Sequence, residues 1–470
     1  MSAARGEPGV HRRAILSAPG SRGDVNPIVA IGRELTRMGF ECHVSVAEPY
    51  AEIVENAGLI ANVVIDRETF DRVVSQTHFW RPWTGARRVL TEVAEKFFQP
   101  HLSLLDRLFV PGSTAVVAHP LDFAARVFRD VTPECRLSSV HLAPAMMRCP
   151  ESPPRLLPDR GWTRAVLPEG WPRLNRLTYY LADIAFLDPA LAPAINEERK
   201  RRAGLTPVRR LLNEWWHSPD QILALYPRWY APEIFQQYAQ PRGDAAALQS
   251  VGFPLDDGES HGDADGESDV SPPETNTSIP VQPIARRPPA FTEPIPRDKP
   301  LLVTTGSAHH GDESFVTRVA EIAAASGVSV VWCCPSNPGG VTHPNIRCVG
   351  YIPLGQWLPH CRGIIHHGGI GTTSRAIHAG TPQLIRPMAF DQFDNAARVE
   401  RLGFGVYLRH DRYLAGAIDE LLAMADGQTV SPPAEPDTRV AAEVAAERAA
   451  KLIAGLLAPS RDANRSASHR

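Results

Sequence analysis

The 470-residue sequence has no hydrophobic run that approaches the roughly 20 apolar residues needed by a membrane-spanning helix. Its first apolar segment, AILSAP at residues 14–19, is too short for the hydrophobic core of a signal peptide and lacks a cleavage-like flank. Both absences predict a cytoplasmic protein. They leave open a peripheral contact with the inner face of the membrane.

Cysteine is scarce, and neither sign of charge dominates. The seven cysteines are odd in number and form no CxxC pair, so neither a disulfide framework nor a zinc site is indicated. The 49 Lys and Arg residues nearly balance the 52 Asp and Glu residues, which gives a formal net charge of -3. This composition excludes a general attraction to nucleic acid, so an anionic ligand must be bound by a local group of donors.

Two stretches of the chain alternate short β-branched runs with helical periodicity. The first starts near residue 14 and places Ile28, Ile31 and Leu35 on one helix face, and the second starts at Leu301. Such alternation is typical of βαβ units in a parallel sheet. The sequence therefore predicts an α/β protein made of two Rossmann-like, doubly wound domains.

The predicted domain boundaries follow from composition. Residues 254–298 are rich in Pro, Asp, Glu, Gly and Ser, and such a segment cannot bury enough apolar surface to offset its ordering entropy. We interpret it as a disordered linker between an N-terminal domain at 1–253 and a C-terminal domain at 299–458. The tail at 459–470 has a similar composition and is also predicted to be disordered.

The C-terminal domain is predicted to end in an amphipathic helix within residues 437–458. Its apolar side chains are expected on one face, and the first half of the chain is one surface on which that face could dock. The predicted face carries Val440, Val444, Leu452 and Leu456.

The segment HHGGIGTTSRAIHAG, residues 366–380, joins a predicted strand to a predicted helix. The amides at the start of that helix are unpaired donors with partial positive charge, which suits a phosphate. Glycines allow close approach of the backbone, while Thr372 and His367 add side-chain donors. The alternative interpretation is an ordinary tight turn in which both histidines bond to local backbone.

The next predicted strand is followed by Asp391 and Gln392, which open another helix at the same sheet edge. A carboxylate and an amide at this place can bind the hydroxyls of a sugar. Diphosphate and polyol together describe a nucleotide sugar. A nicotinamide oxidoreductase is the alternative, but GSRGD after the first strand is not the GxGxxG fingerprint.

Residues 366–405, with GYIPLGQWLPH at 350–360 before them, resemble the two-Rossmann (GT-B) nucleotide-sugar glycosyltransferases of the UDP-glycosyltransferase family, which include sterol and antibiotic glycosyltransferases. The resemblance implies roles for eight residues in this half. It implies that the diphosphate is held by His367, Gly369, Gly371, Thr372 and, in the TTGS loop, Ser307, that the sugar is held by Asp391 and Gln392, and that the base stacks on Tyr351.

One position departs from that family's pattern. Arg375 stands where plant members carry a glutamate for the ribose hydroxyls. UDP and dTDP therefore cannot be distinguished from the sequence. For the TTGS loop, an ordinary turn is an equally good interpretation.

Glycosyl transfer to a hydroxyl needs a base, and the first half supplies candidates. Asp24, in GSRGDV, follows the first strand and matches the position at which many bacterial family members carry aspartate. The alternative interpretation of Asp24 is a helix cap. Asp122 and His119, in AHPLDF, are candidate helpers, with a structural role as their alternative.

The expected acceptor is an apolar molecule with a hydroxyl. Residues 195–233 resemble the corresponding segment of a rhamnosyltransferase of rhamnolipid synthesis, which implies a lipid-like acceptor. Several aromatic residues of this half are expected mainly in the core or the interdomain seam. They are Phe79, Trp80, Trp83, Trp215, Trp216, Tyr226, Trp229 and Tyr230.

The resemblance implies an inverting hexosyltransferase that uses a UDP-glucose or dTDP-rhamnose type of donor and needs no metal or other cofactor. Two alternatives share the architecture. One is a non-catalytic activator of another enzyme, and the other is a nucleotide-sugar epimerase. Retention of Asp24, His367, Asp391 and Gln392 argues against the activator.

Overall fold

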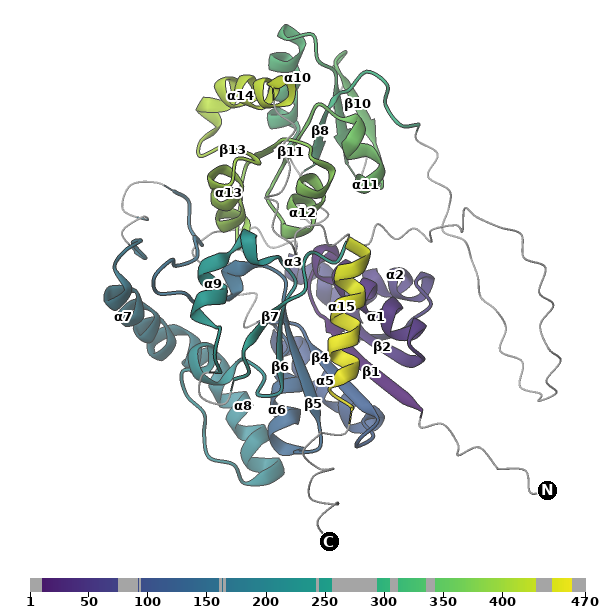
Figure 1. The fold of residues 1–470 in the computed structure, drawn as a ribbon, viewed down its shortest axis with the longest axis vertical. Coiled ribbons are helices and arrows are strands. Elements are labelled where there is room, and N and C mark those ends of the chain that lie inside the picture. Colours follow the sequence, from purple (N-terminus) through teal and green to yellow (C-terminus); the bar gives the residue numbers. More distant parts are fainter. Residues whose placement is uncertain are drawn as a thin grey trace, which may run out of the picture.

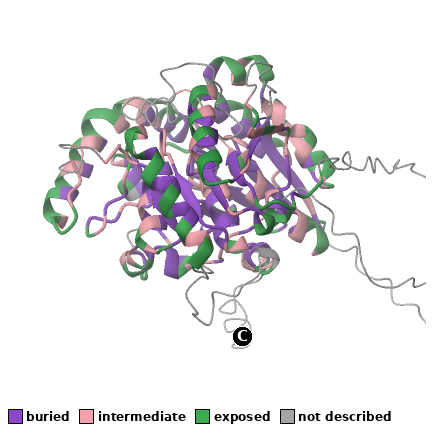
Figure 2. Ribbon diagram, turned by 90° about the horizontal axis from the view of Figure 1, so that it is seen from above, coloured by how far each residue is buried: buried purple, intermediate pink, exposed green. Residues whose placement is uncertain are grey.

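The computed structural model describes residues 11–74, 92, 94–159, 163, 166–241, 245–255, 294–304, 312–334, 343–427 and 442–458. Within these residues the chain forms two parallel sheets, which lie one above the other in Figure 1. The prediction of two doubly wound α/β domains is confirmed. The buried strands run through the interior, and the helices around them expose their outer faces (Figure 2).

Seven described strands form the first sheet in the order β3-β2-β1-β4-β5-β6-β7. The central strands are buried on both faces, as expected for a sheet covered by helices on both sides. In β1, for example, every residue from Ala14 to Ala18 is buried. The strands are β1 Arg12–Ala18, β2 Phe40–Ala47, β3 Ile60–Ile65, β4 Thr114–Ala118, β5 Arg136–His141, β6 Gln221–Ala224 and β7 Leu248–Ser250.

Helices cover both faces of this sheet, and the apolar side of α1 buries the predicted Ile28, Ile31 and Leu35. The α-helices are α1 Arg22–Arg37, α2 Ala51–Asn56, α3 Arg67–Val74, α5 Ala94–Leu108, α6 Phe123–Val131, α7 Pro172–Ala182, α8 Asp188–Ala203 and α9 Pro232–Gln237. Shorter helical turns are η1 Glu48–Tyr50, η4 Pro144–Met146, η6 Asp183–Leu187, η7 Leu211–Trp215 and η8 Arg228–Tyr230.

The second sheet has six described strands in the order β10-β9-β8-β11-β12-β13. They are β8 Leu301–Thr304, β9 Val330–Cys333, β10 Ile346–Val349, β11 Gly363–His366, β12 Gln383–Ile385 and β13 Gly405–Tyr407. The helices of this half are α10 Glu313–Ala325, α11 Leu354–Trp357, η9 Leu358–His360, α12 Ile370–Ala379, α13 Gln392–Arg401, η10 Asp411–Tyr413 and α14 Leu414–Gly427.

The last helix, α15 at Ala442–Gly455, returns to the first half and lies along α1 (Figure 1). The predicted apolar face of this helix is confirmed at Leu452, which packs against the core beside α1, and is wrong at Val444. Val440 lies outside the described residues. Val444 is 43% exposed, whereas Ala449, Ala450 and Ile453 are buried in the core beside α1. Alanine keeps the two helix backbones close, so small side chains rather than the larger valine form this contact.

The two halves meet through a mixed seam. Trp229 and Tyr230, from η8, are buried in one cluster with Phe393 and Phe404 of the second half, which confirms the seam position predicted for these two aromatics. Polar contacts join the same elements, since Arg398 of α13 pairs with Glu233 of α9. Phe79, Trp80 and Trp83 lie outside the described residues.

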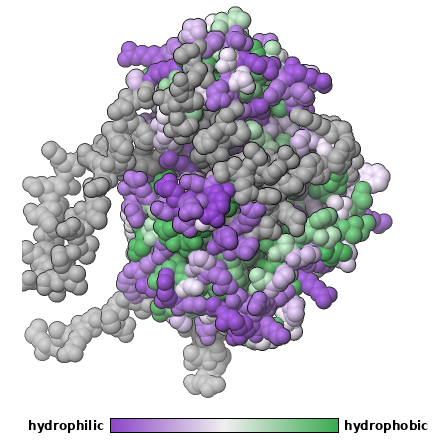
Figure 3. All heavy atoms as spheres, turned by 180° about the vertical axis from the view of Figure 1, so that it is seen from behind, coloured by the Kyte–Doolittle hydropathy of each residue, from purple (hydrophilic) through white to green (hydrophobic). Residues whose placement is uncertain are grey.

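Two further surface features bear on the expectations. In the part of the chain that the structure describes, no helix is both long and apolar enough to cross a bilayer. Hydrophobic side chains do reach the surface along α7 and η6, and Figure 3 shows hydrophobic surface on the side of the molecule where α7 projects. The exposed residues are Trp171, Leu174, Leu177, Tyr180, Leu181, Ile184 and Phe186.

Candidate functional site

The turn between β11 and α12 has the form that a phosphate site requires. Gly368 has φ +93, and a Cβ at this residue would lie 2.6 Å from Ile385 Cγ2 and 3.1 Å from the Gln392 carbonyl oxygen. Only glycine fits this turn without strain. Gly369 is the N-cap of α12, so the first amides of that helix follow it directly.

The first turns of α12 and α1 lie against one another across the two halves. A Cβ built on Gly371 would be 4.0 Å from Gly23 Cα, so these two first turns approach closely. The first amides of α12 carry partial positive charge, which suits an anion. The start of α1 carries the carboxylate of Asp24 instead. Thr372, which is half-buried, lies in the first turn of α12.

The two histidines of the motif have different environments. His366 is buried, donates from Nε2 to Gln383 Oε1 at 3.0 Å and accepts from the Gly368 amide at 3.1 Å. Burial lowers the pKa of His366 to about 3, so it remains uncharged and fixes the turn. His367 is half-buried, and a Cβ on Gly369 would lie 2.6 Å from its Nε2. The imidazole of His367 therefore lies beside the start of α12.

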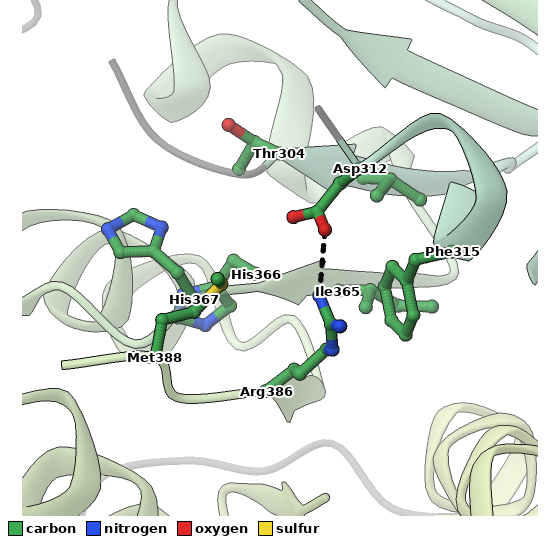
Figure 4. Close-up of a pocket in the computed structure, with 9 residues that line it drawn as sticks. Thr304, Asp312, Phe315, Ile365, His366, His367, Arg386 and Met388 are labelled. Atoms are coloured by element: carbon green, nitrogen blue, oxygen red, sulfur yellow. Dashed lines mark hydrogen bonds and ion pairs between the residues drawn. The ribbon is translucent and has the colours of Figure 1, made fainter. Parts of the chain in front are cut away.

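A cavity lies at the carboxyl edge of the second sheet, and His367, Thr304 and Met388 are among the residues that line it (Figure 4). The opposite wall of this cavity contains Arg386, whose charge is neutralised by two carboxylates. Arg386 donates to Asp312 at 3.1 Å and to both oxygens of Asp411 at 2.9 Å. This arginine thereby ties the start of α10 to the loop after β13.

Asp391 and Gln392 lie where the sequence predicts, at the start of α13. Burial and then the charge of Asp24 raise the pKa of Asp391 to about 7, so the charge of one half acts on a carboxylate of the other. The Oε1 atom of Gln392 accepts from the Met388 amide at 2.8 Å and the Ala389 amide at 3.0 Å. Gln392 therefore shapes the loop in front of Asp391, a structural role that sequence reasoning missed.

Asp24 lies in the first turn of α1 and makes the contacts of a helix cap, which was the alternative interpretation of this residue. Its Oδ2 accepts from the Ser21 amide at 2.6 Å and from the Ser21 hydroxyl at 3.1 Å, as in a capping box. Its Oδ1 accepts from His119 Nε2 at 3.1 Å. Burial raises the pKa of Asp24, but the hydrogen bonds from His119 and Ser21 outweigh burial and hold it below its ordinary value.

His119 is the helper that the structure brings to Asp24. Its Nδ1 accepts from the Leu121 amide at 3.1 Å, so the ring carries its proton on Nε2 and donates it to Asp24. The imidazole is almost completely buried, with 3% of the side chain exposed, while 29% of the Asp24 side chain is exposed. The buried His119 ring thus orients the Asp24 carboxylate, while part of that carboxylate remains accessible to solvent.

Asp122, the other predicted catalytic residue, has a structural place instead. Its side chain is fully buried, caps α6 by accepting from the Ala125 amide at 2.9 Å, and lies 3.0 Å from His101 Nε2. His101 in turn bonds to the Ser45 hydroxyl at 2.8 Å. A carboxylate enclosed in this way cannot reach an acceptor, because burial and its own partners occupy it.

The remaining predicted residues fall into three cases. Tyr351 lies at the junction of the halves, where the Arg22 guanidinium covers its ring at 3.7 Å from the centroid. Arg22, in GSRGD, was not among the residues expected at the site. Arg375 is buried and donates to the Gly371 carbonyl at 3.1 Å, which supports the turn of α12. Ser307 lies outside the described residues.

No group of three or more His, Cys, Asp or Glu side chains suited to a metal ion occurs in the described ranges. All seven cysteines are free, and six of them are buried.

Comparison with known proteins agrees with this architecture. A solved glycosyltransferase of kitacinnamycin superposes with a TM-score of 0.58 at 18% identity, covering 96% of this chain and 100% of that one. The spinosyn rhamnosyltransferase SpnG complexed with thymidine diphosphate gives a TM-score of 0.55 at 16% identity, covering 96% and 100%. The protein has the GT-B fold.

Several sequence relatives of this GT-B protein are antibiotic glycosyltransferases, which confirms the predicted resemblance. Residues 336–458 match the model of the erythromycin biosynthesis protein CIII-like C-terminal domain. The aclacinomycin-T 2-deoxy-L-fucose transferase of Streptomyces galilaeus is 36% identical over 140 residues, which are 28% of this chain and 32% of the relative. That match spans about a third of the relative's length. The O-mycaminosyltylonolide 6-deoxyallosyltransferase of Streptomyces fradiae is 26% identical over 83% of this chain and 84% of its own.

Proposed function

We propose that this GT-B protein transfers a sugar from a nucleoside diphosphate to a hydroxyl of an apolar acceptor. One observation carries the proposal: an accessible carboxylate and the start of a helix suited to diphosphate lie against each other from opposite halves. Gly23 and Gly371 nearly touch, and the charge of Asp24 acts on Asp391. Base, sugar ligand and leaving-group site are therefore within reach of one bound donor.

The proposed reaction is a single displacement. The acceptor oxygen attacks the anomeric carbon and forms the new glycosidic bond, while its proton passes to Asp24. The bond from the anomeric carbon to the β-phosphate oxygen breaks, and the nucleoside diphosphate leaves with the electron pair. The α12 amides and His367 stabilise this developing charge. Attack opposite the leaving group inverts the anomeric configuration.

We propose that no metal takes part in this step. The chain supplies donors of its own at the leaving phosphate, namely the amides at the start of α12 and the side chains of His367 and Thr372. These groups perform the charge stabilisation for which other transferases use a cation.

We propose a dTDP-linked deoxyhexose as donor. Solved relatives of the same fold, SpnG and SsfS6, are described as complexes with thymidine diphosphate, and SpnG is a rhamnosyltransferase. Sequence relatives are described as transferring 2-deoxy-L-fucose or 6-deoxyallose. We propose a polycyclic or macrocyclic antibiotic-type alcohol as acceptor, and a hydroxylated lipid is the competing choice.

The experiment is nucleotide release by the purified protein from dTDP-rhamnose, dTDP-glucose and UDP-glucose, with and without panels of macrolide aglycones and hydroxylated lipids. The proposal expects release that depends on acceptor, with the product of inverted configuration by NMR. Isomerisation of donor without acceptor indicates an epimerase. Binding of donor without turnover with any acceptor indicates the activator role. Either outcome overturns the proposal.

A further inference from the structure

Asn395, on α13, makes hydrogen bonds to three parts of the molecule that the proposed reaction must bring together. Its Nδ2 donates to the Gly368 carbonyl at 2.9 Å and to Asp391 Oδ2 at 2.9 Å. Its Oδ1 accepts from the Tyr230 hydroxyl at 3.2 Å. The residue is completely buried.

These partners belong to different functional groups. Gly368 is the turn residue beside His367, Asp391 is the proposed sugar ligand, and Tyr230 belongs to the N-terminal half. Both amide hydrogens and the amide oxygen of Asn395 are engaged, so the orientation of the side chain is determined by acceptors on one side and a donor on the other. One amide thus fixes the diphosphate turn relative to the sugar ligand.

The link to Tyr230 is part of a larger contact between the halves. The Tyr230 carbonyl accepts from Arg398 at 3.2 Å, and the carboxylate of Asp394 accepts from the Arg155 amide at 3.0 Å. Asp394 and Asn395 are neighbours on α13, Arg398 lies one turn later, and all three contact the first half. The helix that carries the sugar ligand at its start is therefore also the helix that binds the other domain.

We propose that Asn395 is a positioning residue that couples contact between the halves to the geometry of the donor site. Tyr230 in the first half orients the Asn395 amide, and the amide then holds both the Gly368 carbonyl and the Asp391 carboxylate in place. The proposal rests on the function proposed above and concerns the same donor. It predicts that removing a single hydroxyl in the first half weakens donor binding in the second.

The electrostatic surroundings of Asp391 provide a readout that a loss of stability alone does not move. Burial and the charges of Asp24 and Asp394 favour the protonated form of Asp391, whereas the hydrogen bond from Asn395 favours the charged form. Because that bond lowers the pKa of Asp391, its removal should raise this pKa. Binding that depends on a charged Asp391 then weakens at a higher pH than in the unmodified protein.

The experiment measures the affinity of the full-length protein for dTDP-rhamnose and for dTDP alone between pH 5.5 and 9. Asn395→Leu keeps the volume and removes both donors. We expect at least roughly tenfold weaker binding of dTDP-rhamnose, a smaller loss for dTDP, and a pH dependence moved upward. Asn345→Leu is the matched control, because Asn345 also donates twice to backbone carbonyls, at 3.0 and 2.9 Å, but away from the site.

Tyr230→Phe is the milder variant in case Asn395→Leu does not fold. It should lower donor affinity by about three- to tenfold, because it removes one hydrogen bond to the Asn395 amide. Tyr238→Phe is its control, since the Tyr238 hydroxyl donates at 2.9 Å to the Arg148 carbonyl, which belongs to the same half of the chain. Folded Tyr230→Phe with unchanged donor affinity and unchanged pH dependence overturns the coupling. Absence of nucleotide-sugar binding by the unmodified protein is a separate result, and it overturns the proposed function as well.

Discussion

Replacing His119 tests the orientation of the proposed base. His119 Nε2 donates to Asp24 Oδ1 at 3.1 Å, and 3% of its side chain is exposed. His119→Ala removes this donor and leaves the rest of the Asp24 environment in place. This hydrogen bond favours the charged form of Asp24, which is the form present before proton transfer. Its loss therefore acts on the rate through the lost orientation of the carboxylate, and we expect kcat to fall by about 10- to 100-fold.

The pH dependence of kcat should also change in His119→Ala, in a direction that follows from the pKa of Asp24. Asp24 must be charged to accept a proton, and the hydrogen bond from His119 is one of the groups that lower its pKa. Burial, which raises the pKa, is less opposed in His119→Ala. The pKa of Asp24 should rise, so the acid limb of the kcat profile should move towards neutral pH. The assay is initial-rate nucleotide release from pH 4.5 to 9 at saturating donor.

Two further variants make this test specific. His119→Gln places an amide nitrogen close to the position of Nε2 and should restore much of the rate and the acid limb. His101→Gln alters another buried histidine, 3.0 Å from Asp122, and should reduce thermal stability without moving the acid limb. The reasoning is refuted if His119→Ala is folded and keeps both the rate and the acid limb of the unmodified protein.

Four other outcomes follow from the geometry. Asp24→Asn should reduce turnover by more than about a thousandfold with donor affinity nearly unchanged by calorimetry, because the base is lost and the donor ligands remain; a normal rate contradicts the assignment. His367→Ala should weaken dTDP binding and lower kcat, each by about tenfold or more, and equal dTDP affinity would count against a diphosphate role. Gly368→Ala should destabilise the fold, seen as a lower Tm, since φ is +93 and the new Cβ meets Ile385. EDTA should leave the initial rate within about twofold, and recovery of a lost rate by Mg²⁺ would show that a metal takes part.

Much of the fold could be predicted from periodicity alone. In a long, regular helix such as α1, the spacing of Ile28, Ile31 and Leu35 predicts which face is buried. The strand at residues 14–18 is apolar almost throughout, which predicts a buried strand. The face of α15 was predicted correctly at Leu452 and wrongly at Val444, because large apolar residues were assumed to mark the whole contact. Its actual contact uses Ala449, Ala450 and Ile453, since alanine at a close helix pair is favoured by geometry rather than by hydrophobicity.

The site was predictable where local backbone chemistry determines it. Gly368, Gly369 and the start of α12 form the expected turn, and Asp391 precedes α13 as expected. The roles of individual side chains were harder to predict, since they depend on partners far away in the chain. Asp122 caps a helix and lies beside His101. Asn395 accepts a hydrogen bond from Tyr230, which lies 165 residues earlier in the chain. No local pattern in the sequence contains those pairings.

The order of the strands in each sheet explains why residues far apart in the sequence meet at the site. In the first sheet, β1 lies between β2 and β4, so the connections leave in opposite directions at the carboxyl ends of β1 and β4. Ile15 pairs with Val116 in that register, which brings the loops that follow, with Asp24 and His119, to one edge. Such a switch point is where doubly wound sheets bind ligands.

The second sheet repeats this arrangement. There β8 lies between β9 and β11, and Val303 pairs with Ile365, so Thr304 at the end of β8 and the turn at His367 lie at one edge. Each sheet has its own switch point, and the contact between Gly23 and Gly371 shows that the two points face each other. A diphosphate held at one switch point thereby lies next to the carboxylate at the other. The juxtaposition of Asp24 with the start of α12 is a consequence of topology, which is why residues almost 350 positions apart in the sequence can form one site.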